Sequence, residues 1–258
     1  VSNYRIRMLS KNQIKRIQSL ARKKGRREEG CFIAEGNKLV EDTLSVFECD
    51  LILATPSWIV SHAHESLSKI QEVDEQEMSK VSQLVTPPDV LAVYRIPEYH
   101  LNIETLKKEL VLALDTVQDP GNLGTMFRTA EGAGMSGVVL SSGCVDLFNP
   151  KVVRSTMGAM FRVPFYICES MSEEMKQLQN QSFHFYAAHL QGKKNFREET
   201  YDGRIGILIG NEANGLSDEV TALADKKVII PMEGELESLN AAVSAALLMY
   251  EVQRNKQL

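Results

Sequence analysis

Apolar and polar residues alternate along the first hundred residues in the pattern of short secondary-structure elements. A basic helix is predicted over roughly 11–24, and the block ends near Pro97. Between these points the pattern predicts strands at 31–36, 51–55 and 90–96 and helices at 37–47 and 74–84. The first block is therefore expected to form a compact α/β unit.

A second and stronger alternation follows a polar stretch. It predicts strands at 110–115, 137–141, 183–188, 205–209 and 227–230, with helical patterns between them and a last helix over 239–254. Strands that alternate with helices are typical of a mostly parallel sheet covered on both faces. The domains expected are a smaller amino-terminal one over 1–98, a linker over 99–109 and a doubly wound α/β domain over 110–258.

The charge of the chain is unevenly distributed. Hydrophobic residues make up 43% and charged residues 24% of the 258, as in a globular protein, and the net charge is −5. Residues 1–30 hold ten Lys and Arg against two Glu, so this segment carries +8 and the remainder −13. Such asymmetry is typical of a phosphate-binding arm, although a solvated basic helix explains the charge equally well.

The spacing of the cysteines and the first residues of the sequence indicate the cell compartment in which we expect the protein. The cysteines lie far apart, without a CxxC pair or a nearby His at zinc spacing, which favours free thiols over disulfides or a metal site. No apolar run reaches the length of a membrane span, and the basic start is not followed by the apolar stretch of a secretory signal. We therefore expect a cytoplasmic protein with no metal and no membrane partner.

One glycine motif fails as a nucleotide site. Gly132, Gly134 and Gly137 match GxGxxG, but here a helical stretch precedes the glycines and the strand follows them. A dinucleotide fingerprint needs the opposite order, because the helix start must meet the pyrophosphate. A nicotinamide enzyme is therefore disfavoured, and the glycines are interpreted as a helix stop and a turn.

Three other segments carry candidate chemistry. In 119–134, Asn122 is predicted to cap a helix, with Arg128 on roughly the same side. In 207–215, Gly210 ends an apolar strand, where a ligand can approach the backbone closely, and Glu212 can accept a hydrogen bond from a hydroxyl. Each segment alone is equally well explained as ordinary helix capping or as a turn.

The third segment is 229–242. Ser238 is predicted to be the N-cap of the last helix, with Asn240 in its first turn. The free N–H groups of such a helix start can receive an anionic group. Plain capping again explains the segment on its own.

Together and in this order, the three segments resemble the motifs N(x5)R, GNE(x2)G and IPM(x5)SLN of the SpoU (TrmH-like) family of SPOUT methyltransferases. The resemblance covers about the last 150 residues, and FIAEGNKLVEDTL in the first half resembles the substrate-binding domain of ribosomal-RNA members. It implies a doubly wound sheet with a carboxyl-terminal trefoil knot, a smaller α/β/α RNA-binding domain, and a homodimer. The implied activity is methyl transfer from S-adenosylmethionine to a ribose 2′-hydroxyl, foremost in 23S ribosomal RNA.

The resemblance also implies site residues, position by position. The catalytic set is Asn122, Arg128, Glu212, Ser238 and Asn240. The cofactor-binding set is Ile209, Gly210, Asn211, Ile230, Met232, Ser238 and Leu239. The RNA-binding set, which combines the basic arm with a further family-like segment, is Lys23, Lys24, Arg26, Arg27, Arg154 and Ser155.

Several alternatives stay open at this point. Arg128 is either the base that takes the ribose proton or a phosphate anchor, since a free guanidinium has a pKa above about 12 and rarely deprotonates. A transfer-RNA 2′-O-methyltransferase, a base-modifying enzyme of the same fold and a non-catalytic RNA-binding protein are the competing functions. The RNA and the nucleotide modified are not encoded in any motif of the sequence.

Overall fold

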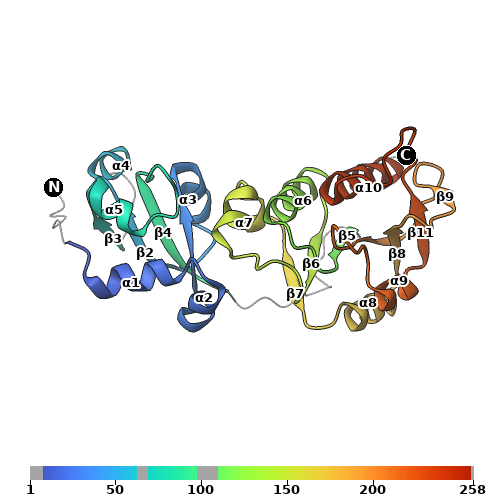
Figure 1. Cartoon of the computed structure of the whole chain (residues 1–258), viewed down its shortest axis with the longest axis horizontal. Coiled ribbons are helices and arrows are strands. Elements are labelled where there is room, and N and C mark those ends of the chain that lie inside the picture. Colours follow the sequence, from blue (N-terminus) through green and yellow to red (C-terminus); the bar gives the residue numbers. More distant parts are fainter. Residues whose placement is uncertain (1–7, 63–68, 98–109, 257–258) are drawn as a thin grey trace. The chain divides into compact units, whose positions relative to one another are not determined.

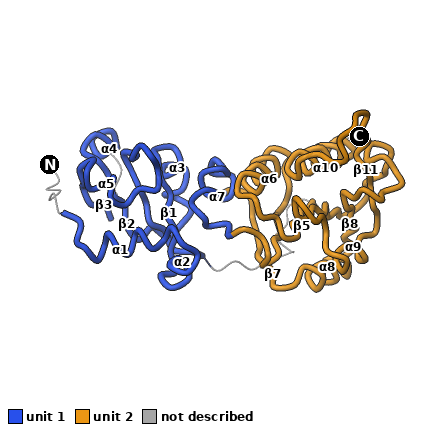
Figure 2. Tube along the Cα trace, viewed as in Figure 1, with its two compact units in different colours: residues 1–98, 146–161 blue, residues 99–145, 162–258 orange. Residues whose placement is uncertain are grey.

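The structure is a computed structural model that describes residues 8–62, 69–97 and 110–256, and it divides into two compact units (Figures 1 and 2). Unit 1 comprises residues 1–98 and 146–161, and unit 2 comprises residues 99–145 and 162–258. The linker expected at 99–109 lies outside the described residues. None of the helices within the described ranges is long and apolar enough to cross a membrane.

Unit 1 is built on a four-stranded sheet. Its order is β1 (Cys31–Glu35), β4 (Val90–Arg95), β2 (Cys49–Ala54) and β3 (Ile70–Glu72). All neighbours are antiparallel except β2 and β3, which are parallel. The helices of this unit are α1 (Lys11–Ser19), α2 (Lys23–Glu29), α3 (Asn37–Thr43), α4 (Pro56–Ser61), α5 (Glu75–Val81) and α7 (Pro150–Ser155), with a 3₁₀ turn at Ala159–Phe161.

The basic helix expected over 11–24 is two helices. α1 begins at a capping box formed by Ser10 and Gln13, and its last turn ends at Leu20. α2 then returns so close to α1 that a Cβ atom on Gly25 would lie 2.1 Å from the carbonyl oxygen of Ser19. Only glycine permits this approach, which is why the helix breaks where the charge pattern runs on unchanged.

Residues 146–161 pack with unit 1, although the sequence placed them inside the second domain. The ring centroid of Phe148 lies 4.9 Å from that of Phe32, and Phe161 lies at the same distance from Phe47. These aromatic contacts join residues over 100 positions apart, so a local strand and helix pattern cannot reveal them.

Unit 2 contains a seven-stranded sheet in which every neighbouring pair is parallel. Its order is β7 (Phe165–Cys168), β6 (Gly137–Ser141), β5 (Leu110–Leu114), β10 (Arg204–Ile209), β8 (Phe183–Ala188), β11 (Lys226–Ile229) and β9 (Lys194–Asn195). Its helices are α6 (Pro120–Gly132), α8 (Met171–Gln179), α9 (Asp218–Leu223) and α10 (Ala241–Lys256). The parallel sheet and its five expected strands are therefore present, while the short β7 and β9 were missed.

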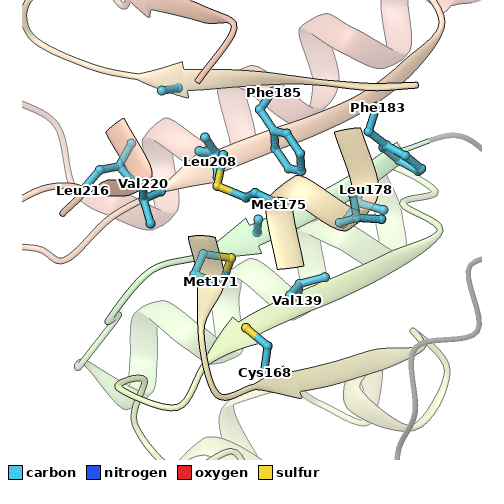
Figure 3. Packing of buried hydrophobic residues seen from close by; sticks show 13 residues of the cluster. Val139, Cys168, Met171, Met175, Leu178, Phe183, Phe185, Leu208, Leu216 and Val220 are labelled. Carbon is cyan, nitrogen blue, oxygen red and sulfur yellow. The ribbon is translucent and has the colours of Figure 1, made fainter. Parts of the chain in front are cut away.

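The core of unit 2 lies between the sheet and α8. Met175 and Leu178 of α8 are buried in the same cluster as Phe185 and Leu208 of the central strands (Figure 3). This packing covers one face of the sheet, and the contacts of α10 with α6, β10 and β8 join the last helix to the same unit. The helices thereby hold the sheet in place, and the loops that follow the strands lie at the carboxyl ends of those strands.

The strand order locates a switch point. From β5 the chain proceeds outward to β6 and β7, then crosses to β8 and returns to β10, which pairs directly with β5. In parallel sheets, ligands bind beyond the carboxyl ends of the strands where the order reverses in this way. Asn122 lies in the first turn of α6, the helix that follows β5, and Glu212 lies in the loop after β10, so two of the expected motifs meet here. The trefoil knot stays a prediction.

Candidate active site

Asn122, Glu212 and Asn240 form one hydrogen-bonded chain. Nδ2 of Asn122 donates to Oε1 of Glu212 at 3.0 Å, and Oδ1 of Asn122 accepts from Nδ2 of Asn240 at 2.9 Å. One residue of each sequence motif thus contributes to a single cluster. Charged and amide side chains held in this way have fixed donor and acceptor directions, as a site for orienting a hydroxyl requires.

The loop after β5 is held against Glu212 by its backbone. The N–H groups of Gln118 and Asp119 each donate to the Glu212 carboxylate at 3.0 Å. Burial acts to raise the pKa of Glu212, but these bonds and the one from Asn122 outweigh it, and the net pKa is lowered. Glu212 is therefore an ionised anchor and a weak proton acceptor at neutral pH.

Helix capping at the site differs from the expectation. The N-cap of α6 is Asp119, whose carboxylate accepts from the N–H of Asn122 at 2.7 Å, so Asn122 lies inside the helix. The N-cap of α10 is Asn240 rather than Ser238, because Oδ1 of Asn240 accepts from the N–H groups of Ala242 and Val243. Asn240 thus uses its oxygen for the helix and its amide for Asn122.

Two further contacts fix the loop after β10. Nδ2 of Asn211 donates to the carbonyl of Thr116 at 2.9 Å, which ties this loop to the end of β5. The buried carboxylate of Asp115 accepts from both the N–H and the hydroxyl of Ser217, at 3.0 and 2.8 Å. Asp115 and Thr116 were not among the expected site residues. The signal that points to them is their position directly after a buried parallel strand.

A pocket of about 300 Å³ lies next to this cluster, and Glu212 belongs to both. Residues of the three loops after β8, β10 and β11 and of the start of α10 form it, among them the unexpected His189 and Ser244. Every member of the expected cofactor set lines it, namely Ile209, Gly210, Asn211, Ile230, Met232, Ser238 and Leu239.

The lining fits S-adenosylmethionine. Apolar side chains from Ile209, Ile230, Met232 and Leu239 suit an adenine ring and a thioether chain. Residues 230–239 lie outside the helices and strands, so their backbone groups are available to a polar ligand. Among the described residues, no group of three or more His, Cys, Asp or Glu is arranged to hold a metal ion.

Gly210 has a structural reason to be glycine. A Cβ atom there would lie 2.2 Å from the carbonyl carbon of Gly215 and from the nitrogen of Leu216. Asn211 and Gly215 pair through two backbone hydrogen bonds, which fold the loop back onto Gly210. The space that the sequence assigned to an approaching ligand is therefore occupied by the chain itself.

Arg128 is not part of the cluster on its own chain. Positions six apart on an α-helix are about 120° apart around the axis, so the expectation that Arg128 shares a side with Asn122 is wrong. Arg128 is exposed and makes no hydrogen bond or ion pair with any residue that the structure describes. Ser238 is also exposed and lines the pocket without capping a helix.

The basic residues divide into two kinds. Lys23, Lys24 and Arg27 are exposed. Arg26 is only 2% exposed: Nε and Nη2 donate to Asp146 at 3.0 and 2.5 Å, and Nη1 donates to the carbonyl of Leu20. Its guanidinium is committed to a buried ion pair, so the expectation that Arg26 binds RNA is wrong.

The family-like segment contains Arg154 and Ser155, which lie at the end of α7 and are partly buried. Nη1 of Arg154 is buried and has no hydrogen-bond partner in the described part of the chain. The guanidinium is therefore not neutralised there by an ion pair as that of Arg26 is.

The fold and the site together define an α/β enzyme with a cofactor pocket and an amide–carboxylate cluster at the switch point of a parallel sheet. Residues 109–250 match the SpoU rRNA Methylase family, and residues 11–92 match the MRM3-like substrate binding domain. The chain belongs to the SpoU rRNA methylase family. This confirms the expected fold class and the expected class of enzyme, an RNA 2′-O-methyltransferase that uses S-adenosylmethionine.

Individual relatives are similar to this chain over nearly its whole length. The 23S rRNA (guanosine(2553)-2′-O)-methyltransferase RlmP of Bacillus subtilis strain 168 is 34% identical over 245 residues, which are 94% of this chain and 97% of that protein. The structure of a TrmH-family protein from Porphyromonas gingivalis is 34% identical with a TM-score of 0.87, covering 96% of this chain and 99% of the other. An AdoMet-bound rRNA methyltransferase from Sinorhizobium meliloti is 31% identical with a TM-score of 0.83 over 95% of each chain.

Proposed function

We propose that this protein methylates a ribose 2′-hydroxyl in 23S ribosomal RNA. The observation that carries the proposal is the Asn240–Asn122–Glu212 chain beside the pocket, which joins three sequence motifs in one place. The Bacillus subtilis relative, which matches both units, supports 23S ribosomal RNA over transfer RNA. With that substrate the reaction takes place in the cytoplasm of a bacterial cell.

In this proposal the residues of the cluster orient the ribose. S-adenosylmethionine, held by the pocket residues, supplies an electrophilic methyl group on a sulfonium centre. The 2′-oxygen forms a bond to that methyl carbon while the carbon–sulfur bond breaks, and the hydroxyl proton leaves to water or to a basic group. The amide of Asn122, fixed on both sides, holds the hydroxyl in line for this transfer. Ser238 and Leu239, which line the pocket from the loop before α10, contact the cofactor.

We further propose a homodimer that brings Arg128 to the site of a second subunit. An apolar groove of about 500 Å³ lies between α6 and α10, lined in part by Thr125, Val243 and Tyr250. Val243 and Tyr250 are 47% and 52% exposed, which is unusual for apolar side chains on one helix face. Arg128 is three residues from Thr125 and shares its face of α6, so a second copy covering the groove buries it at the interface.

Dimerisation is tested by changing the groove without touching the cluster. Val243→Asp with Tyr250→Asp should convert the protein from dimer to monomer in sedimentation analysis and remove methylation. The unfolding temperature of the isolated chain should change little, because both side chains are exposed. A monomeric wild-type protein with full activity would overturn this part of the proposal.

Unit 1, which includes the segment 146–161, is proposed to bind the RNA, through Lys23, Lys24, Arg27, Arg154 and Ser155. The exposed lysines and arginines and the unneutralised guanidinium of Arg154 support this assignment. The substrate is tested by incubating purified protein and labelled S-adenosylmethionine with unmodified 23S ribosomal RNA, 16S ribosomal RNA and transfer RNA. The label should enter 23S RNA at least tenfold faster than the others, and preferential labelling of transfer RNA would contradict the proposal.

A further inference from the structure

The turn between α1 and α2 encloses a polar hollow of about 420 Å³. Its floor is Gly25, the residue whose missing side chain allows the two helices to meet. We call it the α1–α2 hollow and define it by Lys15, Gln18, Ser19, Arg22, Lys24 and Glu28. This surface lies within unit 1, and the residues of the active-site cluster belong to unit 2.

Of the described residues that line the α1–α2 hollow, three are cations and one is a carboxylate. Lys15 and Arg22 are exposed, and neither makes an ion pair with the residues that the structure describes. Lys24 is 3.7 Å from Glu28, but both side chains are largely exposed, so this pair contributes little and is easily exchanged. The hollow is therefore a concentrated positive surface on a chain whose net charge is negative.

The neighbouring arginines are committed elsewhere. Arg16 donates to Glu29 and lies 2.8 Å from Asp50, and the Glu29 hydrogen bond foremost raises its pKa. Arg26 is buried against Asp146. Structure thus sorts the basic segment into arginines that hold unit 1 together and cations that face the hollow, a distinction that the sequence alone does not make.

The neutral groups of the hollow also limit what can bind. The amide of Gln18 donates to the carbonyl of Lys80, and the hydroxyl of Ser19 donates to the carbonyl of Arg16. Among the described residues, none that lines the hollow is aromatic, so these residues offer no surface on which an RNA base could stack. The recognition that remains is attraction of an anion by lysine and arginine.

We propose that the α1–α2 hollow binds the sugar–phosphate backbone of the RNA substrate, through Lys15, Arg22 and Lys24. This inference rests on the proposed function, in which RNA is the substrate, and it adds Lys15 and Arg22 to the RNA contacts proposed for unit 1. Point charges on flexible stems neutralise phosphates without reading bases. The hollow therefore contributes affinity and salt dependence, and sequence choice lies elsewhere.

The test compares two triple variants of equal charge. Lys15→Gln with Arg22→Gln and Lys24→Gln removes the hollow's cations, while Lys38→Gln with Lys176→Gln and Lys193→Gln removes three exposed lysines elsewhere. Binding to transcribed 23S ribosomal RNA is measured by filter retention from about 50 to about 300 mM KCl, a range over which added salt strongly weakens binding through phosphate contacts. The hollow variant should lose about 2 from the slope of log affinity against log salt and about tenfold or more in affinity. The control should keep the wild-type slope.

Four outcomes separate the inference from the proposed function. Equal slopes for the hollow variant and the wild-type protein overturn the inference. Weaker binding of the hollow variant to polyglutamate, with unchanged RNA binding, also overturns it and assigns the hollow to an acidic protein partner. If the inference holds, saturating RNA restores the wild-type kcat while KM stays raised. Failure of the wild-type protein to methylate any RNA contradicts the proposed function but leaves the binding comparison intact.

Discussion

The side-chain amide of Asn122 donates a hydrogen bond of 3.0 Å to the carboxylate of Glu212, 90 residues further along the chain. The two residues meet because β5 and β10 are parallel neighbours and their loops leave the same edge of the sheet. Glu212 also lines the pocket that fits the cofactor. The contact therefore couples the proposed ribose-orienting group to the proposed methyl-donor site.

Replacing Glu212 with Gln should remove most of the activity. The new amide presents N–H groups where Asn122, Gln118 and Asp119 need an acceptor, so the amide of Asn122 loses its fixed direction. We expect kcat to fall by about 10²-fold or more, as for loss of an orienting group. Steady-state methylation of 23S RNA measures this, and Glu219→Gln, an exposed carboxylate in α9, is the matched control. Equal losses in both variants would contradict the assigned role.

The lowered pKa of Glu212 predicts a pH dependence of stability. A carboxyl group with a folded-state pKa below its unfolded value stabilises the folded protein above the unfolded pKa, near 4.3, and loses this contribution as the pH falls through the folded pKa. Wild-type protein should therefore melt at a higher temperature than Glu212→Gln at pH 7, and the difference should shrink below about pH 4. A difference that grows as the pH falls would show that the pKa is raised instead.

Gly210→Ala should disrupt the cofactor loop through steric conflict. Its Cβ atom would collide with the backbone of Gly215 and Leu216, and such overpacking costs about 1–3 kcal/mol or more of unfolding free energy. Gly234→Ala is the control, because a Cβ atom there meets nothing within 4 Å. Denaturant unfolding and calorimetric titration with S-adenosylhomocysteine should show a loss for Gly210→Ala alone. If Gly210→Ala has normal stability and loses only the binding of S-adenosylhomocysteine, a ligand and not the backbone of Gly215 and Leu216 occupies the space beside Gly210.

Asn211 is predicted to hold the cofactor loop to the end of β5. Asn211→Ala removes the bond to Thr116 and the two bonds that its oxygen accepts from the N–H groups of Ala213 and Asn214. Asn211→Asp keeps the latter two and isolates the contact between the loops. Affinity for S-adenosylhomocysteine should fall about fivefold in Asn211→Asp, since a net hydrogen bond is worth about 1 kcal/mol, and further in Asn211→Ala, which loses all three bonds. If Asn211→Asp binds as well as wild type, the contact to Thr116 has no part in positioning the pocket.

Arg26 is predicted to serve stability and not RNA binding. Arg26→Met leaves Asp146 without its partner, and breaking a buried pair costs about 3–5 kcal/mol. The melting temperature of the protein should fall sharply, while the salt slope of RNA binding at a temperature where the variant is folded should not change. A stable Arg26→Met protein with a reduced slope would reverse the assignment.

Local patterns were sufficient for the strands of the parallel sheet, since continuous apolar runs such as Leu110–Leu114 are distinctive. They were insufficient where tertiary packing decides. The two-residue β9 has too few residues for a pattern, and the break between α1 and α2 depends on the close approach at Gly25. The assignment of 146–161 to unit 1 depends on aromatic contacts between distant residues.

The site shows the same division. The motif resemblance selected Asn122, Glu212 and Asn240, which the structure brings together, and a cofactor set of which every member lines the pocket. It could not assign the capping roles, because these depend on which side chain reaches the first free N–H groups. Nor could charge alone distinguish the buried Arg26 from the exposed cations beside it.

The most direct test of the account is nucleoside analysis of 23S ribosomal RNA methylated in vitro by wild-type protein and by Asn122→Ala. Digestion to nucleosides and mass spectrometry identify the atom that received the methyl group. The account predicts a single 2′-O-methylated nucleoside with the wild-type protein and its near absence with a folded, cofactor-binding Asn122→Ala variant. A base-methylated nucleoside, or full 2′-O-methylation by that variant, would contradict the account.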